Sequence, residues 1–153
     1  MDDKSIKKLV EQYIDLNFSI EKNVVSLIKG QICGDLTNDQ QYMLRYINKV
    51  EICTPSELAE IFNVKKSAIT AIINRLWDKG LIKRTRDEKD RRIIYLTLTD
   101  AGKEVFTHSD SNIHNLVASF ITQFDQAEIE AFMKTYEKLN TIILAAKENK
   151  LGE

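Results

Sequence analysis

Residues 54–99 decide the fold, and they read TPSELAEIFNVKKSAITAIINRLWDKGLIKRTRDEKDRRIIYLTLT. The first of them carry the signals of a helix start: a hydroxyl at Thr54 to cap the helix, Pro55 at the first helical position, and Glu57 three residues after the cap. The residues that follow are spaced as on one face of a helix. We therefore expect a short helix that buries Leu58, Ala59, Ile61 and Phe62.

A second helix is expected after a short turn at residues 63–64. It runs from about Lys65 to Lys79, and Gly80 is suited to end it because glycine readily adopts the left-handed conformation found after a helix C-terminus. Its apolar face consists of Ile69, Ile72, Ile73 and Leu76. The opposite face offers small or polar side chains, namely Lys66, Ser67, Thr70, Ala71 and Asn74, with Lys65 at its start.

Residues 81–86 and 93–98 alternate as β-strands do, and residues 87–92, Asp-Glu-Lys-Asp-Arg-Arg, join them. This pattern predicts a two-stranded hairpin with a charged tip. Asp90 lies two residues before Arg92 and could hold its guanidinium group. Helix, turn, helix and charged hairpin together outline a winged helix-turn-helix, which is a DNA-binding fold.

Positive charge is concentrated in the same part of a chain whose net charge is only -1. Residues 65–92 hold ten Lys and Arg against four Asp and Glu, a net charge of +6, which leaves -7 for the remainder. A basic block in an otherwise acidic protein is typical of a polyanion-binding site. A solvated charged surface would more often mix the two signs.

The polar face of the second helix has the chemistry needed to read base edges. Its small side chains allow close approach, the methyl groups of Thr and Ala can contact thymine methyls, and Asn74 can pair with adenine. Arg92 at the hairpin tip suits a narrow minor groove, where the negative potential is enhanced. An ordinary exposed helix face could have the same composition, so the inference depends on the capped helix before it and the basic hairpin after it.

Long amphipathic helices are predicted at both ends of the chain. Residues 4–29 place apolar side chains every three or four positions, and a last helix that begins near Asp125 has an apolar stripe that steps nearly in heptads. Each stripe is longer than a monomer can cover, which indicates dimerisation, although the two helices could instead cover each other within one subunit. Thr99 is expected to cap a helix with a polar run at residues 107–112 that could kink it.

These elements predict a mainly α fold with a small β-wing, a winged helix-turn-helix flanked by N- and C-terminal dimerisation helices. The dimerisation region comprises residues 1–36 and 100–153, and the DNA-binding region residues 37–99. The DNA-binding region opens on a helix that Thr37 caps, with Gln40 in the capping-box position. That helix is expected to direct Tyr42, Met43, Tyr46, Ile47 and Val50 inward.

Several of these segments combine in one pattern: Ser-Ala-Ile-Thr at 67–70, Asn-Arg-Leu-Trp-Asp-Lys-Gly-Leu-Ile-Lys-Arg at 74–84, Asp87, Asp-Arg-Arg at 90–92, and Leu-Thr-Asp-Ala-Gly at 98–102. With this pattern the sequence resembles the MarR family of bacterial winged helix-turn-helix transcriptional regulators. The resemblance extends over the long helices on both sides. It implies a homodimer whose first and last helices interlock, bound to a pseudo-palindromic operator in double-stranded DNA, and it favours repression over activation.

The resemblance also implies which residues bind DNA. They are Lys65, Lys66, Ser67, Thr70 and Asn74 on the recognition helix, and Arg84, Arg86, Asp90 and Arg92 on the wing. In this set Asp90 supports Arg92, while Arg84 and Arg86 match phosphate-facing or structural positions. Arg75 is expected to bond within the wing rather than to read bases.

Release from DNA by a small aromatic effector is a further implication of the resemblance, because such compounds often enter the junction between the dimer helices and the reader in this family. The aromatic side chains that could line such a pocket are Tyr13, Phe18, Tyr42, Tyr46 and Phe106. Several of them could equally be core residues. A thiol-based redox switch of the same fold is an alternative, with Cys33 and Cys53 as the cysteines, although the early first-helix cysteine of the peroxide-sensing branch is missing.

Other classes of protein fit the sequence less well. The chain has five glycines and no Gly-rich loop, nucleophile elbow or paired catalytic carboxylates, so neither an enzyme nor a cofactor is expected. His108 and His114 are six residues apart, on different faces of a helix, so no metal site is expected. The absence of a signal peptide and of a long apolar run predicts a cytoplasmic protein without membrane contact. A winged-helix interaction module that does not bind DNA stays open as an alternative.

Overall fold

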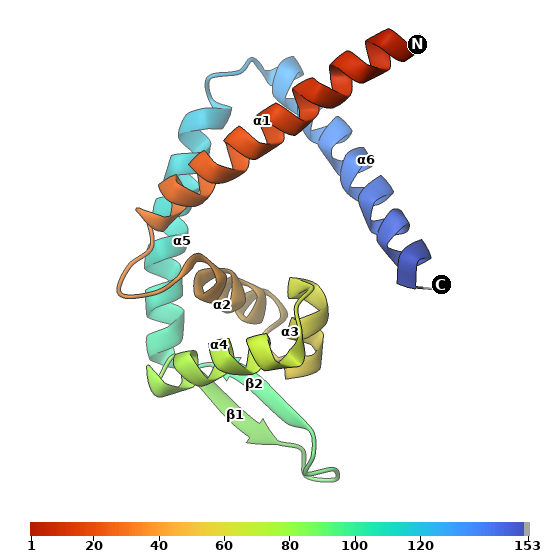
Figure 1. Ribbon diagram of the computed structural model, residues 1–153. Coiled ribbons are helices and arrows are strands. Elements are labelled where there is room, and N and C mark those ends of the chain that lie inside the picture. Colours follow the sequence, from red (N-terminus) through yellow and green to blue (C-terminus); the bar gives the residue numbers. More distant parts are fainter. Residues whose placement is uncertain (152–153) are drawn as a thin grey trace. The chain divides into compact units, whose positions relative to one another are not determined.

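A computed structural model describes residues 1–151, and the chain divides after His114 into two compact units. The helices and strands, in chain order, are α1 (Asp3–Lys29), α2 (Asn38–Val50), α3 (Pro55–Phe62), α4 (Lys66–Asp78), β1 (Ile82–Arg86), β2 (Ile94–Leu98), α5 (Asp100–Ile121) and α6 (Gln126–Leu151) (Figure 1). The mainly helical fold with a small β-wing that the sequence predicts is confirmed. No helix within residues 1–151 is long and apolar enough to cross a membrane.

The predicted helix starts are present as capping boxes. At α3 the backbone N–H of Glu57 donates to Thr54 Oγ1 at 3.3 Å, and the backbone N–H of Thr54 donates to Glu57 Oε2 at 3.3 Å. Thr37 and Gln40 make the same reciprocal pair at α2. These bonds satisfy N–H groups that no helical carbonyl can reach, so they fix where each helix begins.

The turn after α4 is a Schellman motif. Gly80 adopts a left-handed φ of 71°, its N–H donates to the Trp77 carbonyl at 2.8 Å, and the Leu81 N–H donates to the Leu76 carbonyl at 3.0 Å. Leu76 and Leu81 are both buried, which supplies the apolar contact that accompanies this motif. The chain therefore leaves α4 in a fixed direction and enters the wing at once.

The wing is an antiparallel pair in which Ile82 faces Leu98 and Arg86 faces Ile94. Cys53, just before α3, adds a bridge to the middle of β2, with backbone bonds of 3.2 and 2.8 Å to Leu96. Leu96 is fully buried, as the alternation of β2 predicts. The wing is thus anchored at its base to the segment that precedes α3, while its tip extends away from the helices (Figure 1).

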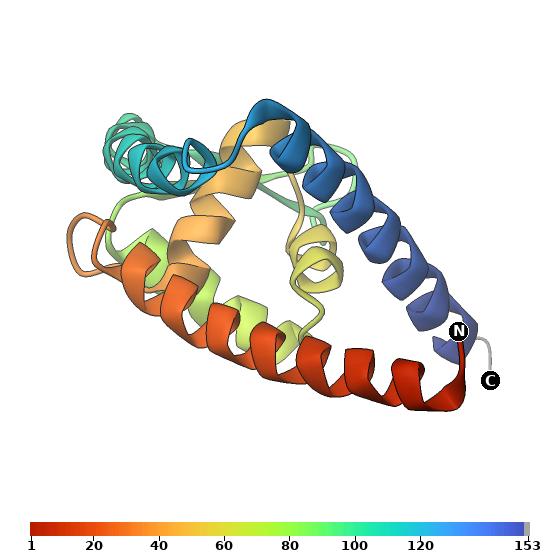
Figure 2. The same cartoon turned by 90° about the horizontal axis from the view of Figure 1, so that it is seen from above.

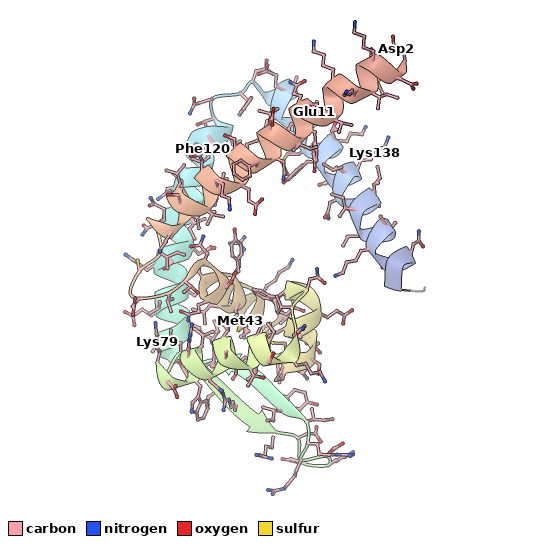
Figure 3. All side chains as sticks on the ribbon, viewed as in Figure 1. Asp2, Glu11, Met43, Lys79, Phe120 and Lys138 are labelled. Atoms are coloured by element: carbon pink, nitrogen blue, oxygen red, sulfur yellow. The ribbon has the colours of Figure 1, made fainter. Side chains whose placement is uncertain are left out.

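The core is formed by side chains from α2, α3, α4, α5 and the base of the wing. Met43 lies within this cluster and is fully buried (Figure 3). The other buried members are Leu36, Leu44, Ile47, Cys53, Leu58, Ile69, Ile73, Leu76, Leu81, Ile82, Leu96, Leu98 and Phe106. Because α4 contributes Ile69, Ile73 and Leu76 to it, its opposite face is left on the surface.

Two residues predicted to be buried are exposed. Tyr42 is 49% exposed and Ile61 57%. In α2 the inward face is centred on Met43, Leu44 and Ile47, which leaves Tyr42 just outside it. The prediction for Tyr42 was wrong because helical periodicity alone leaves the phase of a short apolar stripe uncertain by one residue. Tyr42 and Ile61 instead line one hollow on the surface of α2 and α3.

Helix α5 is uninterrupted from Asp100 to Ile121, and its polar run is used for packing instead of producing a break. Ser109 is completely buried, and its Oγ accepts the backbone N–H of Cys33 at 2.9 Å. Asn112 Nδ2 donates to the Gln31 carbonyl at 3.3 Å. The polar residues of α5 therefore fasten the loop between α1 and α2.

Helices α1 and α6 each run as one continuous rod (Figure 2). Ile28 is the buried residue of α1, and most of the apolar side chains along the rest of that helix are exposed. In α6 the large apolar side chains that are exposed include Phe132, Met133, Tyr136, Ile142, Ile143 and Leu144. Extended apolar surface of this kind is characteristic of an interaction face.

Candidate nucleic-acid interface

The exposed face of α4 carries the side chains that the sequence assigns to base reading. Lys66, Ser67, Thr70 and Asn74 are all exposed, on the side opposite the buried Ile69, Ile73 and Leu76. Lys65 occupies the N-cap position and provides no capping bond, so the first N–H groups of α4 are free of side-chain acceptors. A helix N-terminus in that condition attracts anions such as phosphate.

Arg84 of β1 reaches across to α4. Its guanidinium group donates to Asn74 Oδ1 and lies over the Trp77 ring, 4.9 Å from the ring centre. Neither contact is predicted from the sequence. Arg75 was expected to bond within the wing, but its side chain makes no hydrogen bond or ion pair among the described residues, and Arg84 ties the wing to α4 instead.

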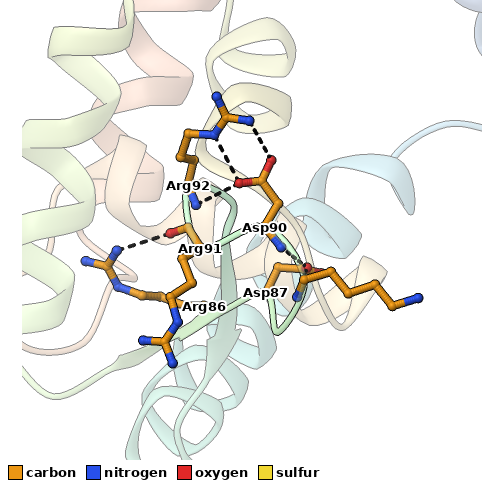
Figure 4. Close-up of polar contacts among 6 residues, drawn as sticks. Arg86, Asp87, Asp90, Arg91 and Arg92 are labelled. Carbon is orange, nitrogen blue, oxygen red and sulfur yellow. Dashed lines mark hydrogen bonds and ion pairs between the residues drawn. The ribbon is translucent and has the colours of Figure 1, made fainter.

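The predicted contact at the wing tip is present. Arg92 Nε donates to Asp90 Oδ1 at 3.1 Å and its terminal nitrogen donates to Asp90 Oδ2 at 3.2 Å, so the carboxylate holds the guanidinium through both oxygens (Figure 4). The Arg92 N–H also donates to Asp90 Oδ1 at 3.1 Å. These bonds from Arg92 lower the pKa of Asp90. The Arg92 side chain is 91% exposed, so the pair orders an arginine that remains available to a partner.

Asp87 organises the loop that carries this arginine. Its Oδ1 accepts the backbone N–H groups of Asp90 and Lys89, both at 2.9 Å, and these bonds lower the pKa of Asp87. Its Oδ2 accepts the Tyr95 hydroxyl at 3.1 Å, which raises the pKa of Tyr95. On the other side of the loop, an Arg86 terminal nitrogen donates to the Arg91 carbonyl at 3.1 Å (Figure 4). The sequence predicts the hairpin, but it does not predict the bond between Tyr95 and Asp87.

Three of the predicted DNA-binding residues line one concave surface. Lys66 and Thr70 of α4 and Arg92 of the wing border a hollow of about 440 Å³ whose other wall is the start of α3. Thr70 Oγ1 donates to the Lys66 carbonyl at 2.8 Å, so its hydroxyl proton is used within the helix. The surface therefore combines two cations and a threonine methyl group in one depression.

The aromatic residues predicted to line an effector pocket are not brought together as a set. Tyr42 and Tyr46 line a hollow of about 390 Å³ with Arg45, Lys49 and Phe62. Phe106 belongs to the core, with 7% exposure, and Tyr13 and Phe18 are exposed on α1. The i, i+4 spacing of the two tyrosines on α2 explains why this part of the predicted set lies on one surface.

The two cysteines and two histidines lie in different surroundings. Cys53 is buried, and this burial raises the pKa of its thiol to about 11, so it is protonated at neutral pH. Cys33 is half-buried, and Asn112 Nδ2 lies 3.7 Å from the Cys33 sulfur. His108 and His114 are exposed, and within residues 1–151 no three His, Cys, Asp or Glu side chains gather as metal ligands would.

Comparison with known proteins finds winged helix-turn-helix transcriptional regulators. The MarR family model matches residues 36–94. Transcriptional regulator AdcR of Streptococcus pneumoniae is 34% identical over 104 residues, which are 64% of this chain and 70% of that protein. The HTH-type transcriptional repressor MdtR of Bacillus subtilis is 35% identical over 94 residues, 61% of each chain. The structure of Streptococcus pneumoniae FabT in complex with DNA shares the fold, with a TM-score of 0.81 at 24% identity over 90% of this chain and 99% of that one.

The matched region contains α2 to α4, β1 and the charged tip of the wing. The relatives are transcriptional regulators, and the fold is shared with a solved structure bound to DNA. The chain belongs to the MarR family of winged helix-turn-helix transcriptional regulators.

Proposed function

We propose that the protein represses transcription by binding duplex DNA with α4 in the major groove and the wing tip in the adjacent minor groove. The observation that carries this proposal is the pairing of Arg92 with Asp90 on the same concave surface as Lys66 and Thr70. An arginine whose guanidinium is already oriented loses less freedom on entering a narrow groove. Ser67, Thr70 and Asn74 contact base edges, while Lys65, Lys66, Arg84 and Arg86 contribute positive charge toward the phosphates.

The bound form is a homodimer. The exposed apolar side chains of α1 and α6 support this part of the proposal, because a second copy would bury them. A two-fold dimer presents two recognition helices to a pseudo-palindrome with half-sites about one helical turn apart, roughly 10 bp. With DNA as its partner, the protein acts in the cytoplasm.

Release by a small effector completes the proposed cycle. The hollow lined by Tyr42, Tyr46 and Phe62 offers aromatic surfaces that suit a small aromatic compound. Its charged rim is mixed, because Asp39 lines it together with Lys49 and Arg45 is paired with Asp110. An effector can release DNA only if it binds the released spacing of the two recognition helices more tightly than the bound spacing. The raised pKa of Cys53 disfavours a thiol switch at that residue, because the thiolate is the reactive form.

A mobility-shift assay with the DNA upstream of the protein's own gene tests the proposal. The protein should shift this DNA at low salt, and Arg92→Ala should weaken binding and lower the salt slope by about one counterion per subunit. Lys103→Ala, which removes one exposed positive charge from α5, is the matched control and should bind as the parent does. No shift at low salt, or equal binding by Arg92→Ala and the parent, would contradict a DNA-binding regulator of this design.

A reporter gene tests the direction of control. Expression from the bound promoter should rise when the gene for this protein is deleted, and an added effector should raise it in the same way. A fall in expression on deletion would identify an activator.

A further inference from the structure

We infer that Arg84 makes Asn74 a donor-only reader, so that α4 selects guanine or thymine at the base Asn74 meets, in preference to adenine and cytosine. The inference rests on the proposed placement of α4 in the major groove. It differs from the expectation from sequence, in which a free asparagine pairs with adenine through one donor and one acceptor.

The orientation of the Asn74 amide follows from the chemistry of its partner. An arginine side chain has five N–H donors and no acceptor, so only the carbonyl oxygen of the amide can face it. The Arg84 guanidinium donates to Asn74 Oδ1 while it stacks on Trp77, 4.9 Å from the ring centre. Arg84 is therefore held by a second contact on the same helix, and the part of Asn74 left for another partner is its NH₂ group, with two donors.

The base edges of the major groove respond differently to such a group. Guanine offers the acceptors O6 and N7, and thymine offers O4, so either can accept from the Asn74 NH₂. Cytosine presents its N4 amino group, which is a donor and would meet a donor. Adenine offers N7 but also an N6 donor, which would have to share Asn74 Oδ1 with the positively charged guanidinium of Arg84.

The position of Asn74 allows this contact. It lies on the exposed face of α4 with Ser67, Thr70 and Ala71, at the helical spacing of one continuous stripe. Ile73 and Leu76, on the other side of the same turns, are buried in the core. Asn74 is thus fixed both by the packing of α4 and by Arg84, and a fixed amide discriminates between bases better than a mobile one.

Selection of bound duplexes from a randomised library, with the full-length protein, gives the preference at every position of each half-site. For the parent, one position per half-site should prefer guanine or thymine over adenine by roughly five- to tenfold. Asn74→Asp keeps the contact with Arg84 but has no donor, so the preference at that position should move to cytosine, whose amino group can donate to the carboxylate. Arg84→Met keeps an apolar side chain on Trp77 and frees the amide, so adenine should become the preferred base there.

Asn48→Asp is the control for the added negative charge, because Asn48 is exposed on α2, away from the recognition helix, and it should leave all preferences unchanged. Unchanged preferences in both Asn74→Asp and Arg84→Met, with retained binding, would overturn the inference while leaving the proposed function intact. A parent protein that shows no base preference at any position would instead overturn the proposed placement of α4, and the inference with it. Thermal unfolding of each variant identifies any loss that comes from misfolding, and Asn74→Asp, which retains its partner, decides the matter if Arg84→Met does not fold.

Discussion

Gly102 lies where α5 passes against the backbone of Leu81, and replacing it with alanine should destabilise the protein. A Cβ atom at residue 102 would stand 2.0 Å from the Leu81 carbonyl oxygen, 2.9 Å from its carbonyl carbon and 3.3 Å from its Cα. The first separation is about 1 Å below any that real Cβ atoms show, and the atom it meets belongs to the backbone and cannot rotate away. The start of α5 and the base of the wing would have to move apart.

The cost of that movement follows from the bonds at this junction. Thr99 N–H donates to the Leu81 carbonyl at 3.1 Å, Thr99 Oγ1 donates to the Gly80 carbonyl at 2.6 Å, and Gly102 N–H donates to Thr99 Oγ1 at 3.0 Å. Overpacking costs about 1–3 kcal/mol, and each weakened hydrogen bond about 1 kcal/mol more. Alanine returns about 1 kcal/mol through its higher helix propensity. With one of the three bonds weakened, the expected net loss in the free energy of unfolding is about 2 kcal/mol.

Urea denaturation followed by circular dichroism measures this loss, at one protein concentration for all variants because the proposed dimerisation would add to apparent stability. A loss of this size should lower Tm by about 4–8 °C. Gly30→Ala is the matched control, since a Cβ there meets only the Leu27 carbonyl oxygen at 3.4 Å and φ is -65°, so it should be neutral or slightly stabilising. If Gly102→Ala were as stable as Gly30→Ala, the contact between α5 and Leu81 would not exist as described.

Three further predictions concern the wing, the end of α2 and the buried thiol. Asp90→Asn removes the charge that holds the Arg92 guanidinium while keeping the size of the side chain, so DNA affinity should fall roughly three- to tenfold in a mobility-shift titration, and equal affinity would refute the orienting role of Asp90. Glu51 has a φ of 68°, which strains an L-residue, so Glu51→Gly should raise the free energy of unfolding by about 1 kcal/mol in urea, and a loss of stability would contradict this. Burial raises the pKa of the Cys53 thiol from 9.0 to about 11, because the folded protein disfavours the thiolate. The stability that comes from burying the protonated thiol is therefore complete below pH 9 and is lost as the pH rises through 11. Alkylation at pH 8 read by mass spectrometry should accordingly modify Cys33 well before Cys53, and equal rates would show that Cys53 is not shielded.

Helix ends and the wing-tip ion pair could be predicted from the sequence because the partners lie close together along the chain. A capping box needs residues three apart, as at Thr54 and Glu57, and the Asp90 carboxylate lies only two residues from Arg92. Local geometry allows few other arrangements for such pairs. The register of the wing follows in the same way from the alternation of its strands.

Contacts between distant residues could not be predicted in this way. Asn74 and Arg84 are on different elements, and no pattern marks an asparagine as the partner of an arginine. The prediction that Tyr42 is buried was wrong, because a shift of one residue in the phase of a helix moves a side chain from the core to the surface. Gly102 did carry a signal, since a glycine within a helix costs stability unless a close approach requires it, but the sequence does not say which backbone approaches.

Helix α5 connects the two parts of the winged region that a regulator has to coordinate. At its N-terminus Thr99 and Gly102 pack it directly on the Gly80–Leu81 turn, which is also where α4 ends and the wing begins. Further along, Ser109 and Asn112 bond to the loop that joins α1 to α2. Each attachment joins a side chain at or on α5 to a backbone atom of the other segment, and the helix between them is unbroken. If the α1–α2 loop were displaced in the proposed release step, α5 would be the element that connects it to the turn between α4 and the wing.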